Sequence, residues 1–269
     1  MKENVELKTS IVKFYEENLR KRIKSFVPLC YHPGGIETTE EILKEAKIGK
    51  DSHVLDVASG IGDTAIYLAA NVGSRVTGID LSQEMVAYAN TLVKEVELDP
   101  HITFLMADAE NLPFKDNVFD VAISECSLCL VPNTRKALCE MKRVIKPEAK
   151  VVVSDVVLKE KLSPNLNNFL SYASCIAGAK TLGEYINEFE KAGLTRIITA
   201  DLSFQVVKQI CQYLENQKTS SEEIVKVGES LVTSFPERYD MKTFQTISFY
   251  LWLTGKIGYY MISGVKTKR

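Results

Sequence analysis

The sequence predicts an α/β protein with a doubly wound, mostly parallel sheet of seven strands. Short apolar segments of strand length alternate with amphipathic helical patterns over most of the chain. A glycine turn at 58–62 follows the first segment and opens a helix. A chain of 269 residues that is 45% hydrophobic and 25% charged can also bury a full core.

Residues 1–47 are expected to form a helical cover. Within residues 4–26, apolar side chains recur at helical spacing among Lys and Glu, which predicts an amphipathic helix. The segment 30–35 contains a Pro-Gly pair and predicts a loop. Thr38 and Thr39 are expected to cap a helix that ends near residue 46.

The α/β core is expected to span residues 48–203. Its strands are predicted at 52–57, 75–80, 102–106, 119–124, 150–156 and 195–201. Helices are predicted between them at 62–71, 83–97, 135–145 and 181–192. Strands that alternate with helices in this way are typical of a parallel sheet, because a parallel crossover needs a helix-length connection.

The end of the chain departs from that alternation. Residues 204–254 are expected to form a helical insertion. Residues 255–269 then supply the final strand of the core, with 258–264 predicted to be antiparallel at or near the sheet edge.

The net charge and the hydropathy of the sequence limit the kinds of partner that the protein is expected to bind. A formal net charge of −2, without a sustained basic block, argues against nucleic acid as a partner. Because the sequence has neither a secretory h-region nor about 18 consecutive uncharged apolar residues, no membrane association is expected and the cytoplasm is the expected location. Most of the six cysteines should then be free thiols. The sequence indicates no oligomeric state.

Acids at the ends of the first two predicted strands indicate a nucleoside-cofactor site. Asp56 precedes the glycine turn, and Asp80 ends the second strand, where a carboxylate can bind the two hydroxyls of a ribose. A dinucleotide site would need a third glycine, but that position is Ala65. The spacing therefore disfavours a dinucleotide.

Residues 56–62 resemble the first motif of the class I S-adenosylmethionine-dependent methyltransferases, with Ala58 in place of the usual first glycine. Four further matches follow in order: Asp80, Ala107-Asp108-Ala109, the run 112–120 and the run 143–147. The resemblance covers about residues 35–200 and implies a Rossmann-like methyltransferase fold that binds S-adenosyl-L-methionine.

The resemblance also implies which residues bind the cofactor. Asp80 corresponds to the ribose-binding acid, Asp108 to the acceptor for the exocyclic amine of adenine, and Ala109 to the backbone beside the ring. Glu125 would contact the methionine amino group or the substrate, unless it lies on the surface. The full expected set is Asp56, Ala58, Gly60, Gly62, Asp80, Leu81, Asp108, Ala109 and Glu125.

Cysteines fall where the substrate pocket is expected. Cys126 and Cys129 follow the fourth strand, Cys175 follows the fifth, and Cys30 precedes the glycine loop at 34–35. This arrangement resembles the arsenite methyltransferases, which implies that Cys30, Cys126 and Cys175 are catalytic thiolates that hold trivalent arsenic. Thiolates are soft ligands, and the arsenic lone pair would be the nucleophile.

Packing is the alternative explanation for the cysteines, because free cysteine is often buried. Cys139 and Cys211 lie inside helical patterns and are expected to pack. The pair Cys126-x-x-Cys129 alone suggests zinc, but no second pair or histidine cluster completes four ligands, so no metal is expected.

Other side chains of the cover allow two interpretations each. His32 would orient the substrate or act as a base, or it lies exposed on its loop. Tyr15 and Tyr31 would close over the cofactor as part of a lid, or they serve as covering aromatics.

The sequence therefore predicts an S-adenosylmethionine-dependent methyltransferase for a small molecule, with trivalent arsenic as the best specific substrate. One alternative is methylation of an organic small molecule in a pocket that the cysteines only line. Another is a non-catalytic protein that binds the cofactor.

Overall fold

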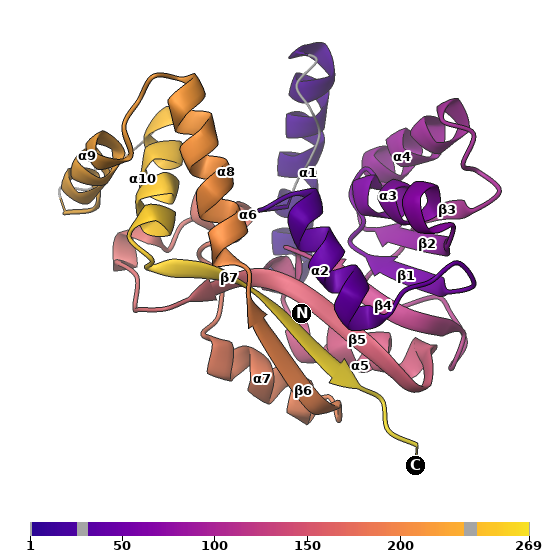
Figure 1. The fold of residues 1–269 in the computed structure, drawn as a ribbon. Coiled ribbons are helices and arrows are strands. Elements are labelled where there is room, and N and C mark those ends of the chain that lie inside the picture. Colours follow the sequence, from indigo (N-terminus) through magenta and orange to yellow (C-terminus); the bar gives the residue numbers. More distant parts are fainter. Residues whose placement is uncertain (1, 26–31, 234–240, 269) are drawn as a thin grey trace.

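A seven-stranded sheet forms the centre of the protein in a computed structural model, which describes residues 2–25, 32–233 and 241–268 (Figure 1). The strand order is β3-β2-β1-β4-β5-β7-β6. The strands are β1 His53–Val57, β2 Arg75–Asp80, β3 Ile102–Met106, β4 Phe119–Glu125, β5 Ile145–Leu158, β6 Thr195–Asp201 and β7 Ile257–Val265. The expected sheet is confirmed, and each expected strand is present.

The strand directions indicate at which end of the sheet a ligand would bind. β7 runs antiparallel to both β5 and β6, and it lies one strand in from the edge. The pairs among β3, β2, β1, β4 and β5 are parallel. The order reverses between β1 and β4, and ligands of such sheets bind beyond the carboxyl ends of the strands at that reversal.

The described helices flank the sheet on both faces and beyond its strand ends (Figure 1). They are α1 Lys2–Ser25, α2 Ile36–Ala46, α3 Asp63–Val72, α4 Gln83–Glu95, α5 Thr134–Val144, α6 Phe169–Ala173, α7 Leu182–Lys191, α8 Ser203–Asn216, α9 Ser221–Thr233 and α10 Met241–Leu253. Short 3-10 turns occur at η1 Leu128–Leu130 and η2 Pro164–Leu166. β5 is longer than the expected 150–156, because it begins directly at Ile145 after α5.

Two hydrophobic clusters form the core, one on each face. Alternate strand residues such as Val54 and Leu55 enter different clusters, as the two-residue period of a strand requires. The first cluster includes side chains of α2, α3, α4, α8 and α10, and the second includes side chains of α5 and α7. The described helices of 204–254 thus pack into the same core as the sheet, and the division into separate segments stays a prediction.

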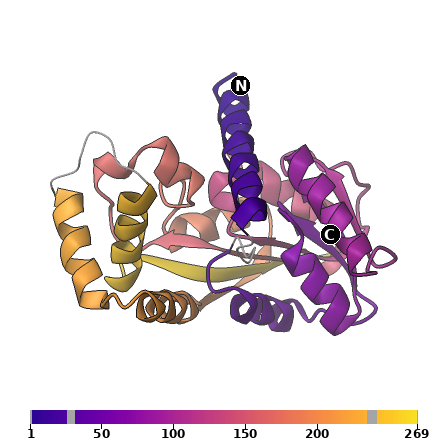
Figure 2. The ribbon, with the colours of Figure 1, turned by 90° about the horizontal axis from the view of Figure 1, so that it is seen from above.

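Helix α1 stands between two groups of helices. Figures 1 and 2 show it beyond the end of the strands, with α8, α9 and α10 on one side and α3 and α4 on the other. Its Leu19 is buried against Ile61 and Met85. Arg20 Nε donates to Glu84 Oε2 at 2.9 Å, and Glu16 Oε1 accepts from Ser82 Oγ at 2.8 Å. These contacts hold α1 against the start of α4.

The expected cap of α2 is wrong. The helix begins at Ile36, and Gly35 occupies the N-cap without a side-chain hydrogen bond. Gly34 and Gly35 have φ angles of 80° and 56°, so the glycines already turn the chain before the threonines. Thr38 and Thr39 are therefore buried within the helix and are available to the site.

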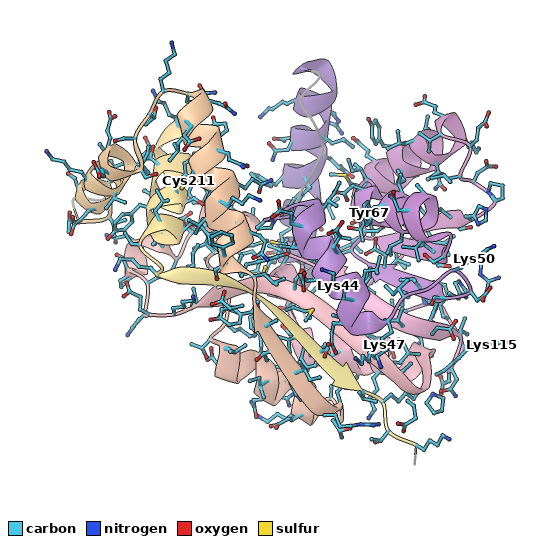
Figure 3. All side chains as sticks on the ribbon, in the orientation of Figure 1. Lys44, Lys47, Lys50, Tyr67, Lys115 and Cys211 are labelled. Carbon is cyan, nitrogen blue, oxygen red and sulfur yellow. The ribbon has the colours of Figure 1, made fainter. Side chains whose placement is uncertain are left out.

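The expected packing of Cys139 is also wrong. Ala137, Leu138 and Met141 form the buried side of α5, so Cys139 points outward and is exposed. Cys211 is half-buried on α8, where its Sγ lies 3.8 Å from Ser221 Oγ. Figure 3 shows Cys211 on the side of α8 and α10, away from Tyr67 on α3.

No helix in the described part of the chain has the length and apolar character needed to cross a membrane.

The Phe104 ring packs against Gly78 of β2, which gives a test of the fold. A Cβ at Gly78 would lie 2.4 Å from Phe104 Cδ1, so Gly78→Ala should lower the free energy of unfolding by about 1–3 kcal/mol. Denaturant unfolding measures the change. Gly183→Ala in α7 is the control, because its Cβ would meet open space, and stability there should stay equal or rise. Equal stability of both variants would contradict this packing.

Candidate active site

A cavity of about 160 Å³ lies at the carboxyl ends of the central strands. Its walls come from residues 58–61 after β1, 79–82 at the end of β2, 107–109 after β3 and 125–127 after β4. Helix α1 closes it with Lys8, Ile11, Val12 and Tyr15. Segments that are far apart in sequence therefore meet at the predicted place.

The glycine turn forms one wall of the cavity. Ala58, Gly60 and Gly62 have φ angles of 59°, 54° and 84°, all left-handed. A Cβ on Gly60 would meet no atom within 4 Å, so the backbone there faces open space. Gly62 is not among the cavity-lining residues, and a Cβ there would lie 2.2 Å from Phe104. Ala58 keeps the turn at a cost of about 1–2 kcal/mol.

Asp80 is fixed by backbone donors at the end of β2. Its Oδ2 accepts from Gly60 N at 2.9 Å, and its Oδ1 accepts from Ser82 N at 2.8 Å. Burial raises the pKa of Asp80, and these backbone N–H groups oppose that rise. Because each carboxylate oxygen has two acceptor sites, Asp80 can still accept from a ligand. Leu81 lines the cavity beside it.

Asp108 and Ala109 line the cavity beyond β3. Asp108 Oδ1 accepts from Glu110 N at 3.0 Å, and Asp108 Oδ2 accepts from Lys8 Nζ at 2.7 Å. Lys8 is a site residue that the motifs do not indicate. The helical pattern does carry a signal for it, because Lys8 shares a helical face with Ile11, Val12 and Tyr15 at spacings of three, four and seven residues.

Carboxylates gather at the other end of the cavity. Glu125 Oε1 accepts from Thr64 Oγ1 at 2.7 Å and from Thr39 Oγ1 at 3.2 Å. Burial raises the pKa of Glu125 and raises that of Asp56 well above its usual value, with Glu125 and Asp63 adding to the shift of Asp56. Asp56 Oδ2 has no hydrogen-bond partner among the described residues. This end of the cavity suits a cationic group.

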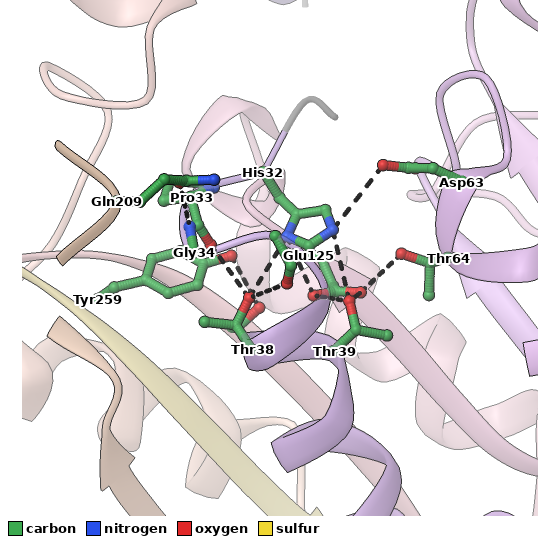
Figure 4. Close-up of polar contacts among 12 residues, drawn as sticks. His32, Pro33, Gly34, Thr38, Thr39, Asp63, Thr64, Glu125, Gln209 and Tyr259 are labelled. Carbon is green, nitrogen blue, oxygen red and sulfur yellow. Dashed lines mark hydrogen bonds and ion pairs between the residues drawn. The ribbon is translucent and has the colours of Figure 1, made fainter. Parts of the chain in front are cut away.

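His32 lies between two of these acids (Figure 4). Its Nδ1 is 3.5 Å from Glu125 Oε2, and its Nε2 is 3.9 Å from Asp63 Oδ2. Thr39 Oγ1 lies 3.4 Å from the same Nε2. The side chain is only 8% exposed and lines the cavity, so the alternative of an exposed loop histidine is wrong.

A group of three thiols lies at the cavity wall. Cys126 lines the cavity, whereas Cys129 and Cys175 are buried. The Cys175 thiol donates to the Cys126 carbonyl oxygen at 3.2 Å. The pKa of Cys175 is lowered by hydrogen bonds from the Cys126 and Cys129 thiols, and Tyr15 acts in the same direction. We call Cys126, Cys129 and Cys175 the thiol cluster.

The thiol cluster brings two of the three predicted cysteines together and adds Cys129. Cys126 and Cys175 have φ angles of 50° and 64°, an uncommon conformation for residues other than glycine and one that concentrates at functional sites. Cys30 and Tyr31 lie outside the described residues. Within the described ranges, no group of three or more His, Cys, Asp or Glu side chains has the geometry to hold a metal ion.

Tyr15 connects α1 to the loop that carries Cys175. Its hydroxyl donates to the Ala173 carbonyl oxygen at 3.0 Å. Burial raises the pKa of Tyr15 well above its usual value, so the phenol stays protonated and remains a donor. Tyr15 therefore closes the cavity at the end nearest the thiol cluster.

Comparison with known proteins identifies relatives by sequence. A family model described as a methyltransferase domain matches residues 48–227. Methyltransferase GfsG of Streptomyces halstedii is 29% identical over 64% of this chain and 63% of its own length. The C-methyltransferase UbiE of Rickettsia rickettsii, from ubiquinone and menaquinone biosynthesis, is 34% identical over 58% of this chain and 70% of its own. An uncharacterized Haemophilus influenzae protein is 35% identical, and the match spans 51% of that protein.

Solved structures share the fold. Phosphoethanolamine N-methyltransferase 2 of Haemonchus contortus, in complex with phosphomonomethylethanolamine and S-adenosylhomocysteine, has a TM-score of 0.71 at 23% identity. That match covers 88% of this chain and 54% of the other. The [4+2]-cyclase SpnF has a TM-score of 0.63 at 21% identity, covering 87% and 81%. A cyclase with this fold shows that the fold alone does not determine the reaction.

The raised pKa of Asp56 predicts a pH-dependent stability. A carboxyl whose pKa is raised by folding stabilises the protein below its unfolded pKa, and this contribution is lost as the pH rises through the folded pKa. In the ligand-free protein, Asp56→Asn should therefore raise Tm by about 2–6 °C at pH 8. The gain should shrink toward pH 4. Thermal unfolding over this range measures it, with exposed Asp99→Asn as the control. A gain independent of pH would contradict the assignment.

Proposed function

This chain belongs to the methyltransferase domain family, and from that premise we propose that it transfers the methyl group of S-adenosylmethionine to a small molecule. One observation carries the proposal. Asp80 and Asp108, at the ends of two neighbouring strands, both line the cavity, and the open backbone of Gly60 lies beside Asp80. That spacing suits a nucleoside that spans the two strand ends.

The residues present fit this cofactor. Asp80 would accept from the ribose hydroxyls, and Asp108 would accept from the adenine amine. Asp56 and Glu125 would face the ammonium of the methionine part, for which Asp56 Oδ2 is a buried acceptor without a partner among the described residues. A Cβ on Gly60 would meet open space, so the turn leaves room for a ligand.

When bound, S-adenosylmethionine supplies a methyl group that its sulfonium already activates. The task of the chain is to align an acceptor with that group and to exclude water. Ile11, Val12 and Tyr15 of α1 provide an apolar cover over the cavity. Glu125 lies next to Cys126 at the end of β4, so the residues expected to hold the methionine part adjoin those expected to meet the acceptor.

For the acceptor, the thiol cluster favours a soft trivalent centre, and we propose trivalent arsenic held by Cys126 and Cys175. Hydrogen bonds from two neighbouring thiols lower the pKa of Cys175, which favours its thiolate, whereas the hydrogen bond to Cys175 and burial raise the pKa of Cys126 well above its usual value. Cys126 would therefore lose its proton as the ligand binds. The lone pair of arsenic requires no base. The strained backbone of Cys126 and Cys175 is a further feature of functional residues.

A second candidate is an organic acceptor that loses a proton. His32 favours it, because the imidazole lines the cavity beside Glu125 and can accept a proton. Leu130 and Val131 add apolar wall to the same cavity. The solved neighbours named for methylation of phosphoethanolamine and of geranyl diphosphate act on organic small molecules. In this case the thiol cluster packs and only lines the pocket.

Cofactor binding can be tested without a known acceptor. Isothermal titration with S-adenosylhomocysteine should show binding to the ligand-free protein. Asp80→Asn should raise the Kd by roughly tenfold or more, because it removes charge-assisted hydrogen bonds worth about 1.5–3 kcal/mol. Asp99→Asn on the surface should not change it. Absence of heat with the unmodified protein would sink the proposed function.

The acceptor is tested by turnover with arsenite, glutathione and S-adenosylmethionine. Methylated arsenic should form, and Cys126→Ser and Cys175→Ser should each reduce the rate by at least roughly 10–100-fold. Exposed Cys139→Ser is the matched control and should retain the rate. No methylated arsenic, with turnover on a panel of alcohols, thiols and amines, would favour the organic acceptor. Binding of S-adenosylhomocysteine without turnover on any acceptor would indicate a binding protein.

A further inference from the structure

Helix α1 places a cation on the acid that is expected to select the nucleobase. Lys8 Nζ lies 2.7 Å from Asp108 Oδ2 and 3.0 Å from Glu110 Oε1. The Lys8 side chain is 18% exposed and lines the cavity. The ammonium therefore stands inside the nucleoside end of the site and not on an open surface.

Two acids share this one lysine. Burial lowers the pKa of Lys8, but hydrogen bonds to Asp108 and Glu110 outweigh burial and raise it, so the side chain stays charged. Glu110 is buried, and its Oε1 also accepts from Asn133 N at 3.2 Å. Lys8 can therefore shift toward Glu110 without losing an ionic partner.

The donors and acceptors of Lys8 and Asp108 affect which bases this end of the cavity can bind. A carboxylate alone offers only acceptors, so it favours a base with an amino group and repels a base with a carbonyl oxygen at the same position. A protonated lysine on that carboxylate offers donors as well. The Lys8–Asp108 pair can hydrogen-bond either an amino group or a carbonyl oxygen of the base if Lys8 moves between Asp108 and the ligand.

We propose that Lys8 is a specificity-determining residue that relaxes the selection of Asp108 for the 6-amino group of adenine. The inference rests on the proposed function, because it assumes that the nucleoside end of the cofactor lies at Asp108. It predicts that the protein tolerates a 6-oxo purine in the ligand better than an unpaired Asp108 would.

The test compares two ligands whose purines differ in the group at the 6-position and in the proton that the 6-oxo purine carries on N1. Dissociation constants for S-adenosylhomocysteine and S-inosylhomocysteine are measured by isothermal titration for the unmodified protein and for Lys8→Met. The preference for the adenosyl ligand should rise by about tenfold in Lys8→Met, which corresponds to about 1.4 kcal/mol. Lys13→Met, on an exposed part of the same helix, should leave the preference unchanged.

Two further variants keep the inference falsifiable if Lys8→Met perturbs α1. Lys8→Gln retains a donor and should leave the preference close to that of the unmodified protein. Adding Asp108→Asn to Lys8→Met should remove the gain, because a carboxamide offers both a donor and an acceptor. An equal or smaller preference in Lys8→Met would overturn the inference while leaving the proposed function intact. Failure of both ligands to bind the unmodified protein would overturn the proposed function itself.

Discussion

The hydrogen bond from Gly60 N to Asp80 Oδ2 ties the turn after β1 to the end of β2, and the site depends on it. It fixes the turn that contains the left-handed residues Ala58, Gly60 and Gly62 and leads into α3. The same turn leaves the Gly60 backbone open toward the cavity. Because β1 lies at the reversal of strand order, this contact fixes Asp80 beside the open turn at the end of the sheet where a ligand would bind.

Charge distribution separates the cavity into two ends. Asp56, Asp63 and Glu125 meet at one end with His32 between them, and Asp108 and Glu110 meet at the other with Lys8. Buried carboxylates repel one another and lose hydration, so the ligand-free fold carries an electrostatic cost at neutral pH. Such a cost is characteristic of sites whose charges are completed by a ligand.

Sequence patterns could predict the parts of the site that depend on local spacing. The strands, the glycine turn and the acids at strand ends follow from periodicity and from the direction of a parallel sheet. The sequence shows that Lys8 shares a helical face with Tyr15, but it could not predict that Lys8 pairs with Asp108 or that Thr39 pairs with Glu125, because the partners lie 100 and 86 residues away. The expectation for Cys139 is wrong for another reason: a helical pattern indicates a buried side only when its phase is known, and α5 buries the neighbouring positions.

The end of β4 lies beside both partners of the proposed methyl transfer. Glu125 is the last residue of the strand and faces Thr39, Thr64 and His32. Cys126 follows with a φ of 50°, so the backbone leaves the extended conformation of the strand at this residue. The Cys126 thiol then lies against Cys175. The successive residues Glu125 and Cys126 therefore lie in two different environments, one rich in polar and acidic side chains and the other formed by thiols. Under the proposed function, a methyl group between them would pass from the cationic sulfonium to a soft acceptor at the thiols, and the left-handed turn at Cys126 places the two environments side by side.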